Sequence, residues 1–184
     1  MSAALLEPVS PSRKLAGERL VVCRIDSPLG PLVAGATDEG LCLLEFSDET
    51  PLDGKLLELE ARRRMRVVAG MNAHLKTVRD ELAGFFAGSL RTFTAPLVLE
   101  GTPFQNRVWQ ALCKIPYGAT CSYEDIAVAV GTPKAVRAVG QANGLNRIAI
   151  IIPCHRVINK GGKLGGYGGG LDRKRWLLDL ESAR

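Results

Sequence analysis

The sequence lacks any long hydrophobic run. A membrane-spanning helix needs roughly 18 consecutive apolar residues, and the longest strongly apolar stretch here is Ile148 to Ile152. The N-terminal residues also lack the basic-then-apolar order of a secretory signal. These absences predict a protein with no membrane association, located in the cytosol or the nucleus, and of the two we expect the cytoplasm.

The sequence also lacks the cysteine spacing of a disulfide framework. It has five cysteines, an odd number, and no two of them form a CxxC pair. This pattern favours reduced thiols in a reducing compartment. The apolar fraction of 46% and the charged fraction of 23% are typical of a folded globular protein, which excludes disorder throughout the chain.

Acidic residues are scarce in the second part of the chain, which gives that part the whole of the net positive charge. Residues 1–100 carry 12 Lys and Arg against 14 Asp and Glu, whereas residues 101–184 carry 12 against 5. A small domain with this basic excess attracts polyanions, of which nucleic acid is the commonest in the cytosol. Charge alone leaves an ordinary solvated basic face equally open.

The first part of the chain predicts a small sheet and one helix. We expect a loose tail over residues 1–17 because two prolines and three serines are mixed there with few large apolar residues. Apolar segments punctuated by Gly and Pro predict an antiparallel meander, with strands over residues 20–26, 32–36 and 41–47. The apolar spacing over residues 72–88 predicts an amphipathic helix. The domain boundaries that follow are a tail 1–17, a first domain 18–95, a linker 96–101 and a second domain 102–184.

The second part begins with three helix signals. Thr102, Pro103 and Gln105 form a capping-box start for a helix ending near Pro116, in which Trp109 and Cys113 are expected to pack. Ser122 opens a short helix to Val130, and Thr132-Pro133 is expected to open another that reaches about Gly144. Two short helices around Gly131 predict a helix-turn-helix, although a hairpin packed in a core remains the alternative. The second helix has few large polar side chains, which favours phosphate contacts over base reading.

One cysteine has an unusual setting. Cys154 follows an apolar run and Pro153, and His155 and Arg156 come directly after it. Neighbouring His or Arg lowers a thiol pKa and increases its nucleophilic thiolate fraction. Adjacent residues on a strand face opposite ways, so Cys154 and His155 cooperate only if the chain turns at Pro153 or a water bridges them. A buried, inert Cys154 is the alternative; the other four cysteines are expected to be inert.

The residues beyond Cys154 are less specific. The segment from Gly161 to Gly170 is a glycine-rich loop that either approaches a flat ligand with its N–H groups or is simply flexible. It is not a P-loop, because Leu164 follows Lys163. A terminal helix is expected over residues 172–181, where Glu181 either orients His155 or is only solvated.

The motifs IPCHRVI, SYEDIA, RAVGQANGLN and GYGGGLDRKRWLLDLE resemble those of the O6-alkylguanine-DNA alkyltransferases, also called methylated-DNA–protein-cysteine methyltransferases. The likeness is strong over residues 102–181 and looser from about Leu20. It implies an α+β fold, with an N-terminal ribonuclease-H-like sheet-and-helix domain and a C-terminal winged helix-turn-helix alkyltransferase domain. The implied activity is DNA repair by irreversible, single-turnover transfer of an alkyl group from O6-alkylguanine, and also O4-alkylthymine, to Cys154.

The resemblance also implies the roles of individual residues. Cys154 would accept the alkyl group, His155 would act as a base through a water, and Glu181 would orient His155. Tyr123 would rotate the phosphate and protonate the leaving guanine, and Asn146 would be a hinge. Arg137 would enter the minor groove and replace the flipped nucleotide. The remaining substrate- and DNA-binding residues would be Ala135, Ser122, Val157, Tyr167 and Gly168.

The resemblance implies no cofactor and no metal, because only Cys42 falls near a zinc-ligand position of the family. The expected partner is double-stranded DNA containing O6-alkylguanine, with no obligate protein partner. Three alternatives remain: a lesion-binding relative without chemistry, in which the reactive cysteine is replaced; a winged-helix regulator, which would prefer one operator; and a Cys-His hydrolase, which would turn over repeatedly.

Overall fold

The computed structural model describes residues 19–48, 54, 56, 57, 59, 60 and 66–182. The predicted tail, residues 1–17, lies outside the described residues. The described chain divides into two compact units on either side of the Glu100–Gly101 peptide. No helix in the described ranges is both long and apolar enough to cross a bilayer.

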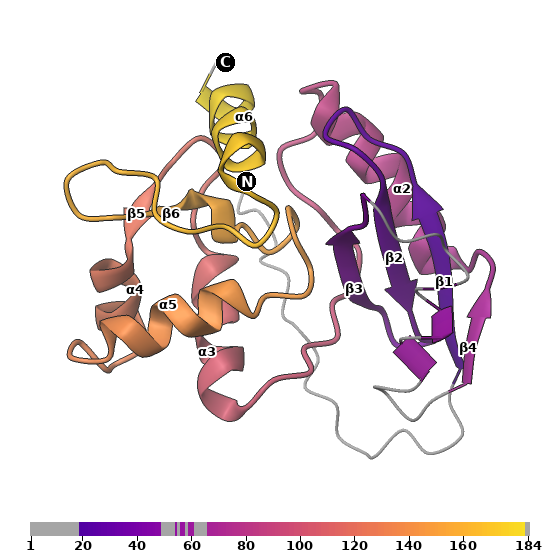
Figure 1. The fold of residues 1–184 in the computed structure, drawn as a ribbon, viewed down its shortest axis with the longest axis horizontal. Coiled ribbons are helices and arrows are strands. Elements are labelled where there is room, and N and C mark those ends of the chain that lie inside the picture. The colour runs from indigo at the N-terminus through magenta and orange to yellow at the C-terminus, as the bar shows by residue number, and fades with distance from the viewer. Residues whose placement is uncertain (1–18, 49–53, 55, 58, 61–65, 183–184) are drawn as a thin grey trace. The chain divides into compact units, whose positions relative to one another are not determined.

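The first unit contains a four-stranded sheet in the order β3-β2-β1-β4 (Figure 1). Strands β1 (Arg19–Ile25), β2 (Leu32–Ala36) and β3 (Leu41–Phe46) form an antiparallel meander, as the sequence predicts. The fourth strand, β4 (Arg66–Ala69), pairs in parallel with β1 and was not predicted. Four residues are too few to show an alternating pattern in the sequence. It is the backbone pairing with β1 that makes this segment a strand.

Helix α2 (Ala73–Phe86) belongs to the same unit. The side chain of Asn72 caps it by accepting a hydrogen bond from the Leu75 amide at 2.9 Å. Four residues of the predicted apolar face are buried: Leu75, Val78, Leu82 and Phe85. The helix prediction is therefore confirmed to within two residues at each end.

Residues 96–100, assigned to a linker by the sequence analysis, belong to the first unit. The Leu41 amide donates to the Pro96 carbonyl, and the Val98 amide donates to the Leu41 carbonyl, both at 2.8 Å. Val98 is 1% exposed and joins a buried cluster on the sheet. The segment is thus held by backbone pairing rather than acting as a free spacer.

The second unit begins with α3 (Pro103–Leu112) and α4 (Tyr123–Ala129), and both predicted capping boxes are present. The Thr102 hydroxyl accepts from the Gln105 amide at 3.3 Å, and the Gln105 side chain accepts from the Thr102 amide at 2.8 Å. Ser122 and Asp125 form the same reciprocal pair at α4. Helix α3 ends at Leu112, four residues before the expected end at Pro116.

Helix α5 (Val136–Gly144) begins later than Thr132-Pro133 predicted. The Thr132 amide donates to the Ala127 carbonyl, and the Ala135 amide donates to the Thr132 carbonyl, so residues 132–135 form a separate turn. The Thr132 hydroxyl is buried without a partner among the described residues and caps nothing. The local cap signal at Thr132-Pro133 therefore predicted the wrong start for α5, because residues 132–135 form a turn that links α5 to the end of α4.

The apolar run Ile148–Ile152 is not a strand. The Ile151 amide donates to the Ala149 carbonyl at 2.8 Å, and Ile150 has a φ of 70°, so this stretch is a buried turn. The short 3-10 helix η1 (Cys154–Arg156) follows Pro153. Strand β6 (Val157–Ile158) then pairs in parallel with β5 (Cys121–Ser122), and α6 (Leu171–Ser182) completes the unit (Figure 1).

Candidate active site

The thiol of Cys154 is enclosed at the start of η1. The residue is 5% exposed, and its amide donates to the Ile152 carbonyl at 2.7 Å. The Nδ2 group of Asn146 lies 3.1 Å from Sγ of Cys154 and also donates to the carbonyl of Ile152 at 3.0 Å. Asn146 therefore fixes the turn before Cys154 and supplies a hydrogen-bond donor to the sulfur.

Opposing effects act on this thiol. Burial raises the pKa of Cys154, because the enclosed site disfavours a thiolate. The Asn146 amide, the positive charge of Lys174 and the backbone N–H groups of Cys154 and His155 all lower that pKa. The site thus holds several groups that stabilise a thiolate once it forms, although burial prevails in the resting protein.

His155 and Glu181 form a buried pair. His155 Nε2 lies 2.8 Å from Oε1 of Glu181, and neither side chain is exposed. An ionised carboxylate only accepts hydrogen bonds, so the neutral imidazole carries its proton on Nε2 and has a lone pair on Nδ1. Burial lowers the pKa of His155, while Glu181 partly opposes that shift, which favours the neutral ring. Nδ1 is buried without a partner among the described residues.

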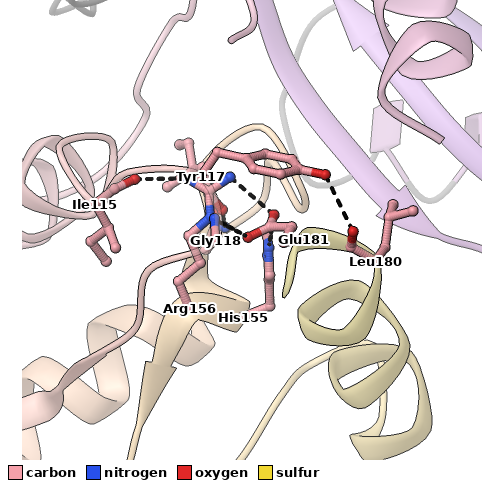
Figure 2. A network of polar contacts seen from close by, with 9 residues as sticks. Ile115, Tyr117, Gly118, His155, Arg156, Leu180 and Glu181 are labelled. Atoms are coloured by element: carbon pink, nitrogen blue, oxygen red, sulfur yellow. Dashed lines mark hydrogen bonds and ion pairs between the residues drawn. The ribbon is translucent and has the colours of Figure 1, made fainter. Parts of the chain in front are cut away.

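Arg156 shares the Glu181 carboxylate (Figure 2). Nε of Arg156 donates to Oε2 at 2.9 Å, and Nη2 donates to Oε1 at 3.0 Å. Nη1 donates to the Ile115 carbonyl at 2.7 Å. Burial alone would raise the pKa of Glu181, but hydrogen bonds from His155 and Arg156 lower it to about 2. The carboxylate is therefore ionised at neutral pH and satisfied on both oxygens.

The turn between α3 and β5 supports this network. The Gly118 amide donates to Oε2 of Glu181 at 3.3 Å, and the Tyr117 hydroxyl donates to the Leu180 carbonyl at 3.4 Å (Figure 2). Gly118 has a φ of 76°, and a Cβ there would lie 3.0 Å from the Glu181 carbonyl oxygen. Glycine is thus required where this turn meets the end of α6.

Lys174 is a buried cation that the sequence analysis missed. It is 0% exposed, and its Nζ donates to the Val157 carbonyl at 2.6 Å and to the Gly166 carbonyl at 3.2 Å. Burial lowers the pKa of Lys174 to about 8, and the nearby Cys154 opposes this shift. A lysine side chain in a terminal amphipathic helix normally faces water. Only its helical position on the inward face of α6 could have indicated from the sequence that Lys174 is buried.

Two tyrosines are electrostatically coupled to the thiol. Burial raises the pKa of Tyr123, at the first turn of α4, and Cys154 raises it further. The same two causes raise the pKa of Tyr167 well above its ordinary value. The Tyr167 hydroxyl is buried without a partner among the described residues. Gly165 has a φ of 69°, and a Cβ there would lie 3.1 Å from the Tyr123 hydroxyl, so the glycine-rich loop passes closely over that ring.

The structure brings some of the predicted site residues together and leaves others apart. Cys154, His155, Asn146 and Glu181 converge on the thiol or the carboxylate beside it. Arg137 is exposed on α5, with Ala135 at the start of that helix. The Ser122 hydroxyl is engaged with Asp125 as a helix cap. Val157 is buried, whereas Gly168 is exposed.

Burial acts on three other cysteines in the same direction as on Cys154, and Cys154 is set apart by the Asn146 amide on its sulfur and the nearby charge of Lys174. Burial raises the pKa of Cys23, and it raises those of Cys113 and Cys121 to about 11. Trp109 packs as expected, with its indole N–H donating to the Ala142 carbonyl at 2.9 Å. Within the described ranges, no three His, Cys, Asp or Glu side chains gather as a metal site would require.

A buried thiol, an amide donor on its sulfur and an imidazole oriented by a carboxylate define a protein built for nucleophilic cysteine chemistry. The family model described as the 6-O-methylguanine DNA methyltransferase DNA-binding domain matches residues 103–183. A methylated-DNA–protein-cysteine methyltransferase of Methanosarcina barkeri is 46% identical over 160 residues, covering 85% of this chain and 94% of that protein. The chain belongs to the methylated-DNA–protein-cysteine methyltransferase family, which confirms the prediction from sequence.

Solved structures agree with this assignment. The crystal structure of Mycobacterium tuberculosis OGT in complex with DNA has a TM-score of 0.77 and 45% identity, over 89% of this chain and 93% of that one. The O6-methylguanine-DNA methyltransferase of Pyrococcus kodakaraensis has a TM-score of 0.61 and 25% identity, over 88% and 98%. The expected mixture of sheet and helices is therefore confirmed.

Proposed function

We propose that this protein repairs duplex DNA by transferring the alkyl group of O6-alkylguanine, and also of O4-alkylthymine, to Cys154. The single observation that carries the proposal is the enclosed Cys154 thiol beside an imidazole whose Nε2 is fixed by Glu181 and whose Nδ1 is free to accept a proton. Family membership supports the same chemistry.

The reaction begins with loss of the thiol proton. The S–H bond of Cys154 breaks, and the proton passes through a water to Nδ1 of His155. Glu181 stabilises the resulting imidazolium, as expected for a buried carboxylate with a pKa of about 2. The Asn146 amide and the charge of Lys174 stabilise the thiolate, which would otherwise be disfavoured in a buried site.

The thiolate then attacks the alkyl carbon. A carbon–sulfur bond forms as the carbon–oxygen bond breaks, and the electron pair goes to guanine, which takes a proton from Tyr123. The imidazolium of His155 then releases the proton that it took from the thiol, and this proton restores the Tyr123 hydroxyl, so both side chains are neutral again and the sum of the steps is one thioether and one guanine. No group in the site reverses a thioether, so each protein molecule reacts once.

The second unit is proposed to bind the DNA. We assign residues 102–184 to a winged helix-turn-helix domain with α4 and α5 as its helix pair, and residues 18–95 to a ribonuclease-H-like domain. The basic excess after residue 100 favours phosphate contacts that are independent of sequence. Ser122 and Ala135 would lie beside the DNA backbone.

The damaged base must leave the DNA helix before its alkyl carbon can reach Cys154. The target carbon is out of reach within stacked DNA, and extruding a base costs a few kcal/mol, less for a poorly paired lesion. Arg137, exposed on α5, would enter through the minor groove and fill the space left by the base. The extruded guanine would lie against Val157, the Tyr167 ring and the Gly168 N–H.

The test uses duplex DNA labelled in the methyl group of O6-methylguanine. The wild-type protein should retain one label per molecule on Cys154, located by peptide mass spectrometry, with no further turnover. Cys154→Ala should retain none, and Cys113→Ala should behave as wild type because Cys113 lies at the end of α3 and is not the thiol that Asn146 and Lys174 act on. Label retained by Cys154→Ala would refute the proposal.

The same experiment separates the alternatives. A lesion-binding protein would hold the DNA without acquiring label, a hydrolase would release it repeatedly, and a winged-helix regulator would prefer one operator over random duplex. A cytoplasmic location remains a prediction from the sequence.

A further inference from the structure

Five buried side-chain polar atoms in the second unit have no partner among the described residues, and two of them lie in the surroundings of Cys154: Nδ1 of His155 and the hydroxyl of Tyr167. Buried polar atoms in native proteins are nearly always hydrogen-bonded to protein or to an ordered water. A pair of such atoms beside one reactive thiol calls for a common explanation. The inference drawn from them rests on the proposed function.

The two side chains lie close together. The His155 and Tyr167 rings are 6.4 Å apart between centroids and nearly perpendicular, at 83°. Tyr167 and Cys154 are near enough that their charges influence each other, and His155 follows Cys154 in the chain. The unpartnered hydroxyl, the unpartnered nitrogen and the sulfur therefore belong to one small buried region.

The backbone around Tyr167 is held on both sides. Lys174 Nζ donates to the Gly166 carbonyl at 3.2 Å, before Tyr167. After it, Arg173 donates to the Gly169 carbonyl at 3.1 Å, and the Gly170 amide donates to the Tyr167 carbonyl at 3.1 Å. Two side chains of α6 and the turn at Gly170 thus anchor the backbone of the glycine-rich loop on both sides of Tyr167.

Hydrogen-bonding capacity identifies what fits between these atoms. Nδ1 of His155 only accepts, because Nε2 carries the proton for Glu181, whereas a tyrosine hydroxyl donates one hydrogen bond. A buried water needs two to four polar partners. Nδ1, the Tyr167 hydroxyl and Sγ of Cys154 supply three. We propose that Tyr167 is a positioning residue whose hydroxyl holds the water that carries the thiol proton to His155.

The proton transfer balances with this water in place. The thiol donates to the water oxygen, and the water donates to Nδ1. When the S–H bond breaks, one proton moves onto the water and another moves from the water onto Nδ1, so an N–H bond forms. The Tyr167 hydroxyl donates to the water throughout and keeps its own proton. Its ring remains available as a wall for the flipped base.

Tyr167→Phe removes the hydroxyl and keeps the ring. The measurement is the pH dependence of Cys154 modification by iodoacetamide, followed at the Cys154 peptide by mass spectrometry, so that neither DNA binding nor base flipping contributes. We expect the midpoint to rise by about one pH unit and the rate at pH 7 to fall about tenfold, the change that one pKa unit makes in the thiolate fraction.

Tyr117→Phe is the matched control. It also removes a tyrosine hydroxyl in the second unit, but one that donates to a backbone carbonyl of α6, and it should leave the midpoint where it is. Thermal unfolding of both variants shows whether either substitution disturbs the fold. A merely structural role for Tyr167 would lower stability without moving the midpoint.

Three outcomes overturn the inference: an unchanged midpoint in Tyr167→Phe, an equal shift in Tyr117→Phe, or a loss confined to reaction with O6-methylguanine DNA. The last would mean that the hydroxyl contacts the base instead of a water. These results are distinct from failure of the proposed function, which would appear as wild-type protein that takes no methyl group from DNA yet reacts with iodoacetamide.

Discussion

His155 Nε2 lies 2.8 Å from Glu181 Oε1, and the two side chains have no exposed surface. The contact joins residues 26 positions apart, one on η1 and the other at the end of α6. It orients the imidazole, fixes its tautomer and leaves Nδ1 as an acceptor. Arg156 engages the same carboxylate through two nitrogens, so Glu181 is a shared support of both residues that follow the thiol.

Glu181→Gln should destabilise the fold at neutral pH by about 3–5 kcal/mol, because the guanidinium of Arg156 would stay buried without its counter-charge. The pKa of Glu181 is lowered from 4.5 to about 2. Its ionised form therefore stabilises the fold fully above about pH 4.5, and this contribution is lost as the pH falls toward 2. The measurement is the free energy of unfolding by urea between pH 3 and pH 7.

Because glutamine does not titrate, the difference between wild type and Glu181→Gln should be constant above pH 5 and shrink below pH 4.5. Asp179→Asn, an exposed change on the same helix, should leave stability nearly unaltered at all pH values. A difference that stays constant down to pH 3 would contradict the pKa assigned to Glu181.

Lys174→Met should raise the pKa of Cys154 and slow iodoacetamide modification at pH 7, because a positive charge that stabilises the thiolate is replaced by a neutral side chain of similar length. The pH profile of Cys154 modification measures this. Lys163→Met, in the exposed part of the glycine-rich loop, is the matched control and should react like wild type. If the pH profile of Cys154 modification were the same in Lys174→Met as in Lys163→Met, Lys174 would have only a packing role.

Gly118→Ala and Gly131→Ala separate backbone strain from contact with Glu181. Both glycines have a positive φ, 76° and 74°, so each substitution should cost about 1–2 kcal/mol of stability. A Cβ at 118 also meets the Glu181 carbonyl at 3.0 Å, whereas a Cβ at 131 meets nothing within 4 Å. We expect only Gly118→Ala to slow methyl transfer beyond its effect on folding, as measured by single-turnover rates at matched folded fraction. Equal rates in the two variants would remove any role for this turn in holding the carboxylate.

Arg137→Ala should slow repair of O6-methylguanine in duplex DNA by about tenfold or more, because extrusion of a base costs a few kcal/mol that an inserted side chain offsets. Modification of Cys154 by iodoacetamide should be unchanged, since Arg137 is exposed on α5. Arg175→Ala removes the same charge from α6 and should alter repair far less. A parallel loss in both variants would mean that Arg137 contributes only general attraction for DNA.

Local patterns in the sequence predicted much of the secondary structure. The meander, α2, and the capped starts of α3 and α4 follow from turn residues, apolar spacing and cap pairs that act within a few positions. The start of α5 was wrong, because backbone hydrogen bonds to α4 displaced a local cap signal at Thr132. Strands β4, β5 and β6 were missed, since two to four residues depend on a partner strand for their pairing.

The sequence by itself determined the family, and it singled out Cys154 as the candidate nucleophile, because Cys154, His155 and Arg156 are consecutive and the chemistry of such a group can be recognised without coordinates. Only the tertiary structure decided the surroundings of that thiol. It buried Lys174, let both His155 and Arg156 bond the carboxylate of Glu181, and brought the Tyr167 ring to 6.4 Å from the His155 ring, between centroids. These contacts join η1, the glycine-rich loop and α6. The pKa values of the site residues are set by burial and by long-range hydrogen bonds, and a local sequence pattern encodes neither.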